Sequence, residues 1–189
     1  MRIAAFILVF VALFLPGCLT VESKEYRITL NSDHSGEATI KFINIVSESD
    51  DTLDISDDDF QQLIEFYIEG SQLEKENPGF KNVKKRLYEE NGVLVGEVSF
   101  SFDSLVAVRL FRYDQSSPVM YFVGNPLSSE QFQESNGTRG PDWMPVVFWP
   151  KDATEIYLKT KVSSEVPYQR SVLKYFQAWK SAQPDRDKQ

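Results

Sequence analysis

The chain holds few side chains suited to redox or nucleophilic chemistry, because it contains one cysteine, Cys18, and one histidine, His34. A single cysteine allows neither an internal disulfide nor a cysteine-based metal site. Any histidine-dependent triad would have to include His34, which lies between Asp33 and Ser35 in a segment rich in turn formers. Three neighbours in sequence do not converge as a triad does, so we interpret His34 as a turn residue.

A second candidate for chemistry is a run of acidic residues that could bind a divalent cation. It consists of Asp50, Asp51, Asp54, Asp57, Asp58 and Asp59. The run lacks the glycine and terminal glutamate spacing of a helix–loop–helix calcium site. The alternative is a solvated loop that leads into a helix N-terminus, where negative charge is favourable. We therefore predict no metal ligand here, and no cofactor for the chain.

The N-terminal residues have the pattern of an export signal. Arg2 supplies a positive charge, and residues 3–15 carry no polar side chain. This apolar run is shorter than the roughly 20 residues that a bilayer-spanning helix needs, and it has the length of a signal-peptide core. It is followed directly by Pro16, Gly17 and Cys18.

Leu15, Pro16, Gly17 and Cys18 together resemble the lipobox of bacterial lipoproteins, with leucine three positions before the cysteine and a small residue just before it. The resemblance implies cleavage of residues 1–17 and attachment of diacylglycerol, often with a further acyl chain such as palmitate, to Cys18. Such a lipid would anchor the protein to a membrane of the bacterial cell envelope. The alternative is an ordinary signal peptide, or a short signal anchor, in which Cys18 is incidental.

The residues after Cys18 bear on where the domain would lie. Leu19 is not the aspartate that retains enterobacterial lipoproteins in the inner membrane, so the resemblance implies an outer-membrane address facing the periplasm in a Gram-negative source. Residues 18–24 are expected to form a tether that reaches ~20 Å when fully extended. We predict a single domain over residues 25–180, close to its membrane, and a polar tail over residues 181–189.

A long polar segment from Asn125 to Trp143 is a candidate binding loop, because long loops in compact domains are often functional. Aromatic side chains flank it, and they could recognise a peptide, a glycan or a lipid tail. The candidate binding residues are Tyr121, Arg139, Asp142 and Trp143. The alternative is ordinary core residues beside a surface loop.

Overall charge argues against one class of partner. The chain carries 20 Lys and Arg against 28 Asp and Glu, a formal net charge of -8. Nucleic-acid binding needs a cationic surface to neutralise phosphates, so we expect no nucleic-acid partner.

Catalytic motifs are absent from the sequence. It has no glycine-rich phosphate loop, no G-x-S-x-G elbow and no H-E-x-x-H helix. Paired carboxylates of a hydrolase cannot be recognised among so many acids. We predict no catalytic residue and favour a non-catalytic protein.

The elements that would position these residues follow from periodicity. Alternation of period two predicts a hairpin with strands at residues 24–31 and 37–46. Apolar residues at helical spacing predict an amphipathic helix that starts with Ser56 as N-cap and ends at Gly70. Asn91-Gly92 predicts a two-residue hairpin turn, with Arg86 paired to Glu97 and Val83 to Phe100.

Further strands are predicted at residues 119–123, 146–149 and 155–162, and a final amphipathic helix around residues 172–179. The segment 104–111 fits either a short helix or a strand. Together these elements predict an α+β fold: a mostly antiparallel sheet built from hairpins, with two amphipathic helices packed on one face.

Three functional hypotheses follow. The first is an envelope lipoprotein whose non-catalytic domain binds a protein or another envelope component. The second is a carrier or sensor of a lipid or other apolar ligand, which a cavity lined by Phe, Tyr and Val would favour. The third is a small envelope hydrolase that uses two converging carboxylates.

Overall fold

The computed structural model describes residues 19–49, 52–123, 130–162 and 167–183. Within these residues the chain is mostly antiparallel sheet with a few short helices, so the predicted α+β class is confirmed at that level. The proposed export signal, the lipobox residues and Cys18 lie outside the described residues.

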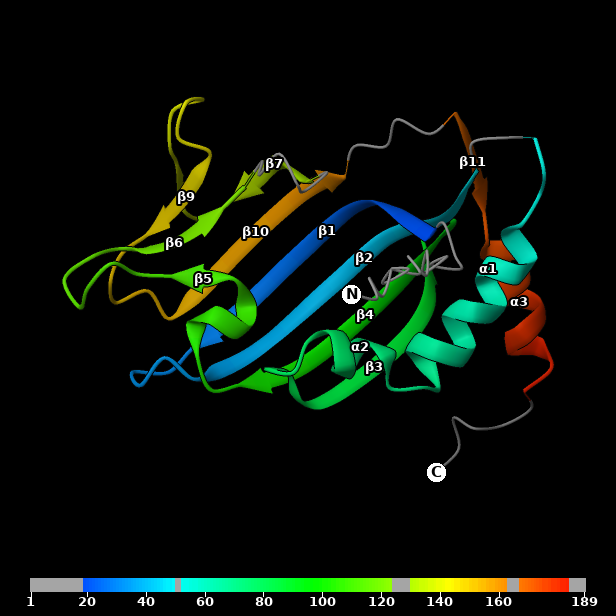
Figure 1. The fold of residues 1–189 in the computed structure, drawn as a ribbon, viewed down its shortest axis with the longest axis horizontal. Helices are drawn as coiled ribbons and strands as arrows, with labels where there is room; N and C mark the ends of the chain where they lie inside the picture. The colour runs from blue at the N-terminus through cyan, green and yellow to red at the C-terminus, as the bar shows by residue number, and fades with distance from the viewer. Residues whose placement is uncertain (1–18, 50–51, 124–129, 163–166, 184–189) are drawn as a thin grey trace, which may run out of the picture.

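A large sheet forms the body of the molecule, and its two longest strands lie side by side at its centre (Figure 1). The strands follow in the order β3 (Lys81–Glu90), β4 (Val93–Phe102), β2 (Gly36–Ser49), β1 (Leu19–Leu30), β10 (Glu155–Val162) and β7 (Glu130–Ser135), and β11 (Tyr168–Ser171) pairs with the end of β2. Every pairing is antiparallel, as the predicted hairpins require.

A small sheet packs against one end of the large one, at the left of Figure 1. Its order is β5 (Leu110–Phe111), β6 (Val119–Phe122), β9 (Val146–Trp149) and β8 (Thr138–Arg139). One apolar core joins the two sheets and contains side chains such as Ile28, Phe102 and Trp149.

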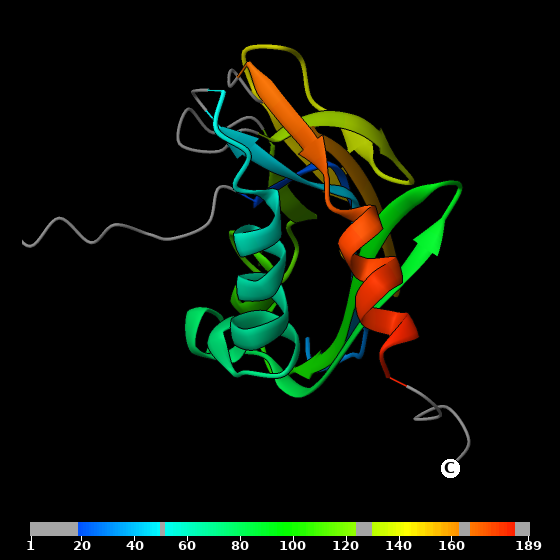
Figure 2. The same cartoon turned by 90° about the vertical axis from the view of Figure 1, so that its right-hand side faces the viewer.

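α1 (Ser56–Gln62) and α3 (Leu173–Ser181) lie at the other end of the large sheet (Figure 1). α1 continues as the π-helix η1 (Leu63–Ile68), and α2 (Gln72–Glu76) follows nearer the middle of the sheet; a 3₁₀ turn, η2 (Leu105–Val108), precedes the small sheet. Figure 2 shows α1 and α3 standing side by side. A second apolar cluster joins Phe60 of α1 and Phe176 of α3 to Ile45 and Leu94 of the sheet.

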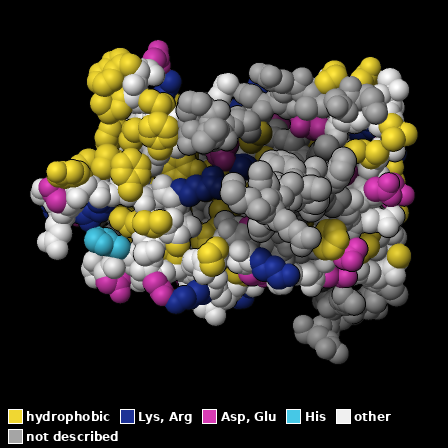
Figure 3. All heavy atoms as spheres, in the orientation of Figure 1, with side chains coloured by type: hydrophobic (Ala, Val, Ile, Leu, Met, Phe, Trp, Pro, Cys, Tyr) yellow, Lys and Arg dark blue, Asp and Glu magenta, His cyan; other side chains and the backbone are white. Residues whose placement is uncertain are grey.

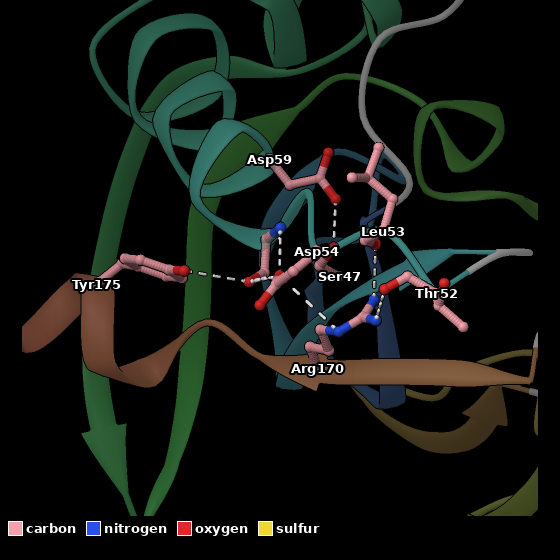
Figure 4. Close-up of polar contacts among 8 residues, drawn as sticks. Ser47, Thr52, Leu53, Asp54, Asp59, Arg170 and Tyr175 are labelled. Carbon is pink, nitrogen blue, oxygen red and sulfur yellow. Dashed lines mark hydrogen bonds and ion pairs between the residues drawn. The ribbon is translucent and has the colours of Figure 1, made fainter.

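Polar contacts fix the start of α1 where four elements meet (Figure 4). Ser47 of β2 donates a 2.5 Å hydrogen bond to Oδ2 of Asp59, a carboxylate that is almost fully buried. Arg170 of β11 donates to the carbonyl oxygens of Thr52 and Leu53 and lies 3.9 Å from Asp54. Asp59 and Asp54 of the predicted acidic run therefore stabilise the fold, because Asp59 binds Ser47 and Asp54 lies beside Arg170.

The hairpin at Asn91-Gly92 forms in the predicted register, with Arg86 opposite Glu97. The predicted register extends to Lys84, opposite Ser99, and then shifts by one residue before Lys81, opposite Ser101. Two residues, Asn82 and Val83, therefore lie opposite Phe100, where the prediction placed Val83 alone. Asn82 lies in this interval with a φ of 52°, and a left-handed residue of this kind accompanies an inserted residue in a strand.

Two other boundaries differ from the predictions. Leu19 already belongs to β1 and pairs with Ser47, so residues 19–24 are strand and not free tether. Most of these residues are polar, so no alternation of apolar and polar side chains predicts a strand here, although the side chain of Ser23 is buried in the structure. Ser56 is the first residue of α1 and not its N-cap, because its hydroxyl donates to Asp54 instead of receiving a helix N–H.

Candidate functional site

An apolar pocket of about 380 Å³ lies between the large sheet and the helical segment that follows α1. Its volume is within the range of small-molecule sites. The sheet side contributes Tyr26 and Ile28 from β1, Ile40 and Phe42 from β2, Leu87 from β3, and Val98 and Phe100 from β4. The helical side contributes Leu63, Phe66, Tyr67, Ile68, Leu73 and Phe80.

Strand alternation places the sheet residues on one face. Tyr26, Ile40 and Val98 are register partners across β1, β2 and β4, so their side chains point to the same side. Phe42 and Ile45 both line the pocket although they are three positions apart, a spacing that would place them on opposite faces of a regular strand. Asn44 between them has a φ of 57°, which breaks the alternation and turns Ile45 back toward the pocket.

The helical side of the pocket is held to β3 by one half-buried lysine. Lys85 points to the pocket face opposite Val98, where a lysine would otherwise be unfavourable. Its ammonium donates to the carbonyl oxygen of Gly70 at 2.7 Å and to Glu74 at 2.9 Å. This cation thereby ties the end of η1 and the start of α2 to the large sheet.

Several pocket side chains are apolar yet not fully buried. Ile40, Phe42 and Leu63 are half-buried, and Phe66 on η1 is 41% exposed. A π-helix is rare and is found at functional sites more often than elsewhere. Apolar surface left open in this way favours a ligand or partner that covers it.

A polar cluster closes one end of the pocket. Glu130, whose side chain is 7% exposed, accepts a hydrogen bond at 2.7 Å from the ammonium of Lys24. The hydroxyls of Tyr26 and Thr160 each donate to Oε2 of Glu130 at 2.9 Å. The cluster joins β1, β7 and β10 across the large sheet, and Lys24 and Tyr26 of this cluster also line the pocket.

The protonation states in this cluster follow from burial and charge. Burial alone would raise the pKa of Glu130, but the attraction and hydrogen bond of Lys24, with the two hydroxyl donors, hold that pKa below its usual 4.5. Burial also raises the pKa of Tyr26 far above its ordinary value, together with neighbouring Tyr121 and Glu130. Glu130 is therefore an ionised acceptor near neutral pH, and Tyr26 a permanent donor.

Arg109 is the other cation at this end of the pocket, between η2 and β5. Its φ of 58° is left-handed, which is uncommon for a residue with a side chain. Its guanidinium lies 3.9 Å from Oε1 of Glu130, and its side chain is 67% exposed. Partial burial opposes the charge, but nearby Tyr121, Tyr26 and Glu130 raise the pKa of Arg109, so it remains a cation.

One polar atom of the pocket wall has no hydrogen-bond partner. Oε1 of Gln62, at the end of α1, is buried without a donor. A buried acceptor of this kind costs stability unless something donates to it.

Among the described residues, no group of three or more His, Cys, Asp or Glu is placed to hold a metal ion. The arrangement therefore suits binding of an apolar ligand with a polar end.

The predicted binding residues do not form one site. Tyr121 is buried in β6 beside the polar cluster, and its ring lies 5.8 Å from that of Tyr26. Arg139 and Asp142 pair with each other at 3.0 Å on the surface, and Trp143 is 78% exposed. Of these four residues, Tyr121 lies next to the pocket and the other three lie elsewhere.

The predicted loop 125–143 is also wrong in part, because residues 130–135 form β7 and residues 138–139 form β8. Both are polar edge strands, so the apolar alternation that predicts strands is weak there. Residues 124–129 lie outside the described residues. Glu130, the centre of the polar cluster, belongs to β7, and no pattern in the sequence distinguishes it from the surrounding polar residues.

Apolar side chains also gather on the outer face of the small sheet, over β5, β6 and β9 (Figure 3). Phe111, Met120 and Phe148 are register partners there, so they share one face. Phe111 and Phe122 are exposed. This outer aromatic face is separate from the pocket lining.

Comparison of the chain with protein-family models, curated proteins and solved structures gave no match. In the part of the chain that the structure describes, no helix is both long and apolar enough to cross a membrane.

Proposed function

We propose that this protein is an envelope lipoprotein, anchored through Cys18, whose domain binds an acyl chain or a similar apolar ligand without catalysis. The observation that carries the proposal is the apolar pocket, with half-buried Ile40, Phe42 and Leu63 facing one another from sheet and helix. A carrier or sensor of a lipid needs a cavity of this kind. Each methylene that enters would contribute about 0.8 kcal/mol.

The helical segments supply the second wall of the binding site in this proposal. We infer that α1 and α3 are the two amphipathic helices packed on one face of the large sheet. Their apolar cluster with Ile45 and Leu94 supports this reading. α1 leads directly into η1, so packing of α1 on the sheet positions Leu63 and Phe66 over the pocket.

A pair of isoleucine variants tests the pocket. Ile40→Trp adds a large side chain inside it, whereas Ile43→Trp makes the same change on the same strand but on the opposite face. The full chain in nanodiscs would be titrated with the neutral apolar fluorophore N-phenyl-1-naphthylamine, with empty nanodiscs as background. Saturable binding should persist in Ile43→Trp and weaken at least about tenfold in Ile40→Trp, because the added indole occupies the cavity. Equal binding by both variants would contradict the proposal.

The anchor is a separate part of the proposal. Leu19 lies in β1, so the domain would follow the lipidated residue directly and sit at the membrane surface, in the outer membrane facing the periplasm if the source is Gram-negative. Cys18→Ser should abolish labelling by a clickable fatty acid and release the protein from the membrane fraction. Persistent labelling of that variant would exclude Cys18 as the lipid site.

A second candidate function is interaction with another envelope protein, which the outer aromatic face favours. Exposed apolar patches on a small sheet mark contact sites more often than chance. Crosslinking in the native envelope should trap a partner with the unaltered chain and fail with Phe122→Ser. A partner trapped equally well by Phe122→Ser would remove this face as the contact site.

A further inference from the structure

The charges along the apolar pocket are unlike those of the chain as a whole. The side chains of Lys24, Lys85 and Arg109 line it together with one acid, Glu76. Arg86 and Glu97 also border it, but they are register partners whose side chains lie on the opposite face of the sheet. The chain has a net charge of -8, so three cations in one lining are a local feature.

Most of these cations are already engaged. Lys85 donates to Glu74 and to the carbonyl of Gly70. Lys24 pairs with Glu130 at 2.7 Å. Arg109 contrasts with them, because its guanidinium lies 3.9 Å from the nearest oxygen of Glu130, farther than the other cations lie from their acids.

Arg109 is also placed to meet the end of a ligand that lies in the pocket. It follows η2, whose Ala107 and Val108 line the apolar wall, so the guanidinium lies where the apolar lining gives way to the polar cluster. The hydroxyl of Tyr26 at the same end already donates to Glu130, which leaves Arg109 as the donor that faces the ligand. Guanidinium groups bind carboxylates and phosphates through two parallel hydrogen bonds.

We infer that the ligand is an amphiphile with an anionic head group, and that Arg109, supported by Lys24, binds this head while the apolar chain fills the pocket. This inference rests on the proposed function. A cationic head is disfavoured, because the one acid of the polar cluster, Glu130, is already bound by Lys24, Tyr26 and Thr160.

Three probes with the same sixteen-carbon chain and a diazirine in that chain would test the inference: hexadecanol, palmitate and hexadecyl phosphate. The full chain in nanodiscs would be irradiated with each probe, and labelled peptides would be mapped by mass spectrometry. The concentration that gives half-maximal labelling of the pocket peptides should be about tenfold lower for each anionic probe than for hexadecanol. High salt should reduce this difference, because it screens the attraction between charges. Stronger labelling by palmitate than by hexadecyl phosphate would identify a carboxylate head group. Stronger labelling by hexadecyl phosphate would identify a phosphate.

Arg109→Gln should remove most of the preference for the anionic probes and leave labelling by hexadecanol unchanged. Because the side chain is exposed, the variant is expected to fold. Arg27→Gln is the matched control, since it removes the same charge from the opposite face, where Arg27 pairs with Glu25. Equal labelling by all three probes would overturn the head-group inference while the proposed function stood. Absence of label from the pocket with every probe would overturn the proposed function itself.

Discussion

The ammonium of Lys24 lies 2.7 Å from Oε1 of Glu130, although 106 residues separate them in sequence. The pair joins β1 to β7, an edge strand of the large sheet, and β10 lies between these two strands. Thr160 of β10 completes the contact by donating to the same carboxylate. The polar end of the pocket is therefore built by the sheet topology, and its charges hold three strands together.

Glu130→Gln should destabilise the fold by about 2 kcal/mol, because the charged acceptor of Lys24 is lost while the cations around it remain. Chemical unfolding in urea measures this loss. Glu134→Gln, an exposed change on the same strand, is the control and should shift stability by less than about 0.5 kcal/mol. A loss no larger for Glu130→Gln than for the control would contradict the role assigned to the cluster.

The same carboxylate predicts a pH dependence. The folded-state pKa of Glu130 is lower than its unfolded value, so its stabilisation is complete above the unfolded pKa of about 4.5. The contribution disappears as the pH falls through the lower folded-state pKa. The stability difference between the unaltered chain and Glu130→Gln should therefore shrink between about pH 6 and about pH 3. A difference that stays constant over this range would show that Glu130 is not responsible.

Gln62→Leu should raise the free energy of unfolding by about 1 kcal/mol, because it removes a buried acceptor that has no donor. Thermal unfolding would show a melting temperature higher by roughly 3 °C. Gln61→Leu is the neighbouring control on the exposed side of α1, where the side chain bonds Asp57, and it should give no gain. A destabilised Gln62→Leu would mean that the amide makes a contact that the fold needs.

Gly137→Ala should destabilise the junction between the two sheets. A Cβ at this position would lie 2.7 Å from the carbonyl oxygen of Phe148 and from the indole of Trp149. The indole cannot withdraw easily, because its N–H donates to Asn136 at 2.7 Å. We expect a loss of about 2 kcal/mol in urea unfolding, the cost of overpacking, against little change for Gln133→Ala on the exposed side of β7. Equal stability of the two variants would contradict this packing.

Local turn chemistry explains what could be predicted. Asn91-Gly92 sets a two-residue turn, and the turn alone determines which residues of β3 and β4 face each other nearby. The predicted register holds as far as Lys84, and the shift at Asn82 could not be predicted because no apolar pattern marks it. Polar edge strands such as β7 were missed for a related reason, since side chains that face solvent on an edge carry no alternation to detect.

The pocket could not be predicted because its lining comes from strands and helices that are far apart in sequence. Lys24, Arg109 and Glu130 each look like ordinary surface charges until the sheet brings β1, β7 and the turn after η2 together. The sequence did predict the apolar faces of the hairpins and of α1. Periodicity shows which side of each element is apolar. It does not show that a pocket separates the apolar side of the sheet, at Ile40, from the apolar side of the helical segment, at Phe66.

The most direct test of the central claim is native mass spectrometry of the protein released from its own membranes in a mild detergent. The unaltered chain and Ile43→Trp should each carry a co-purified apolar ligand, visible as a constant added mass that collisional activation removes. Ile40→Trp should lack that mass, because the indole takes its place. An unaltered chain without any added mass, or a mass retained by Ile40→Trp, would contradict the account.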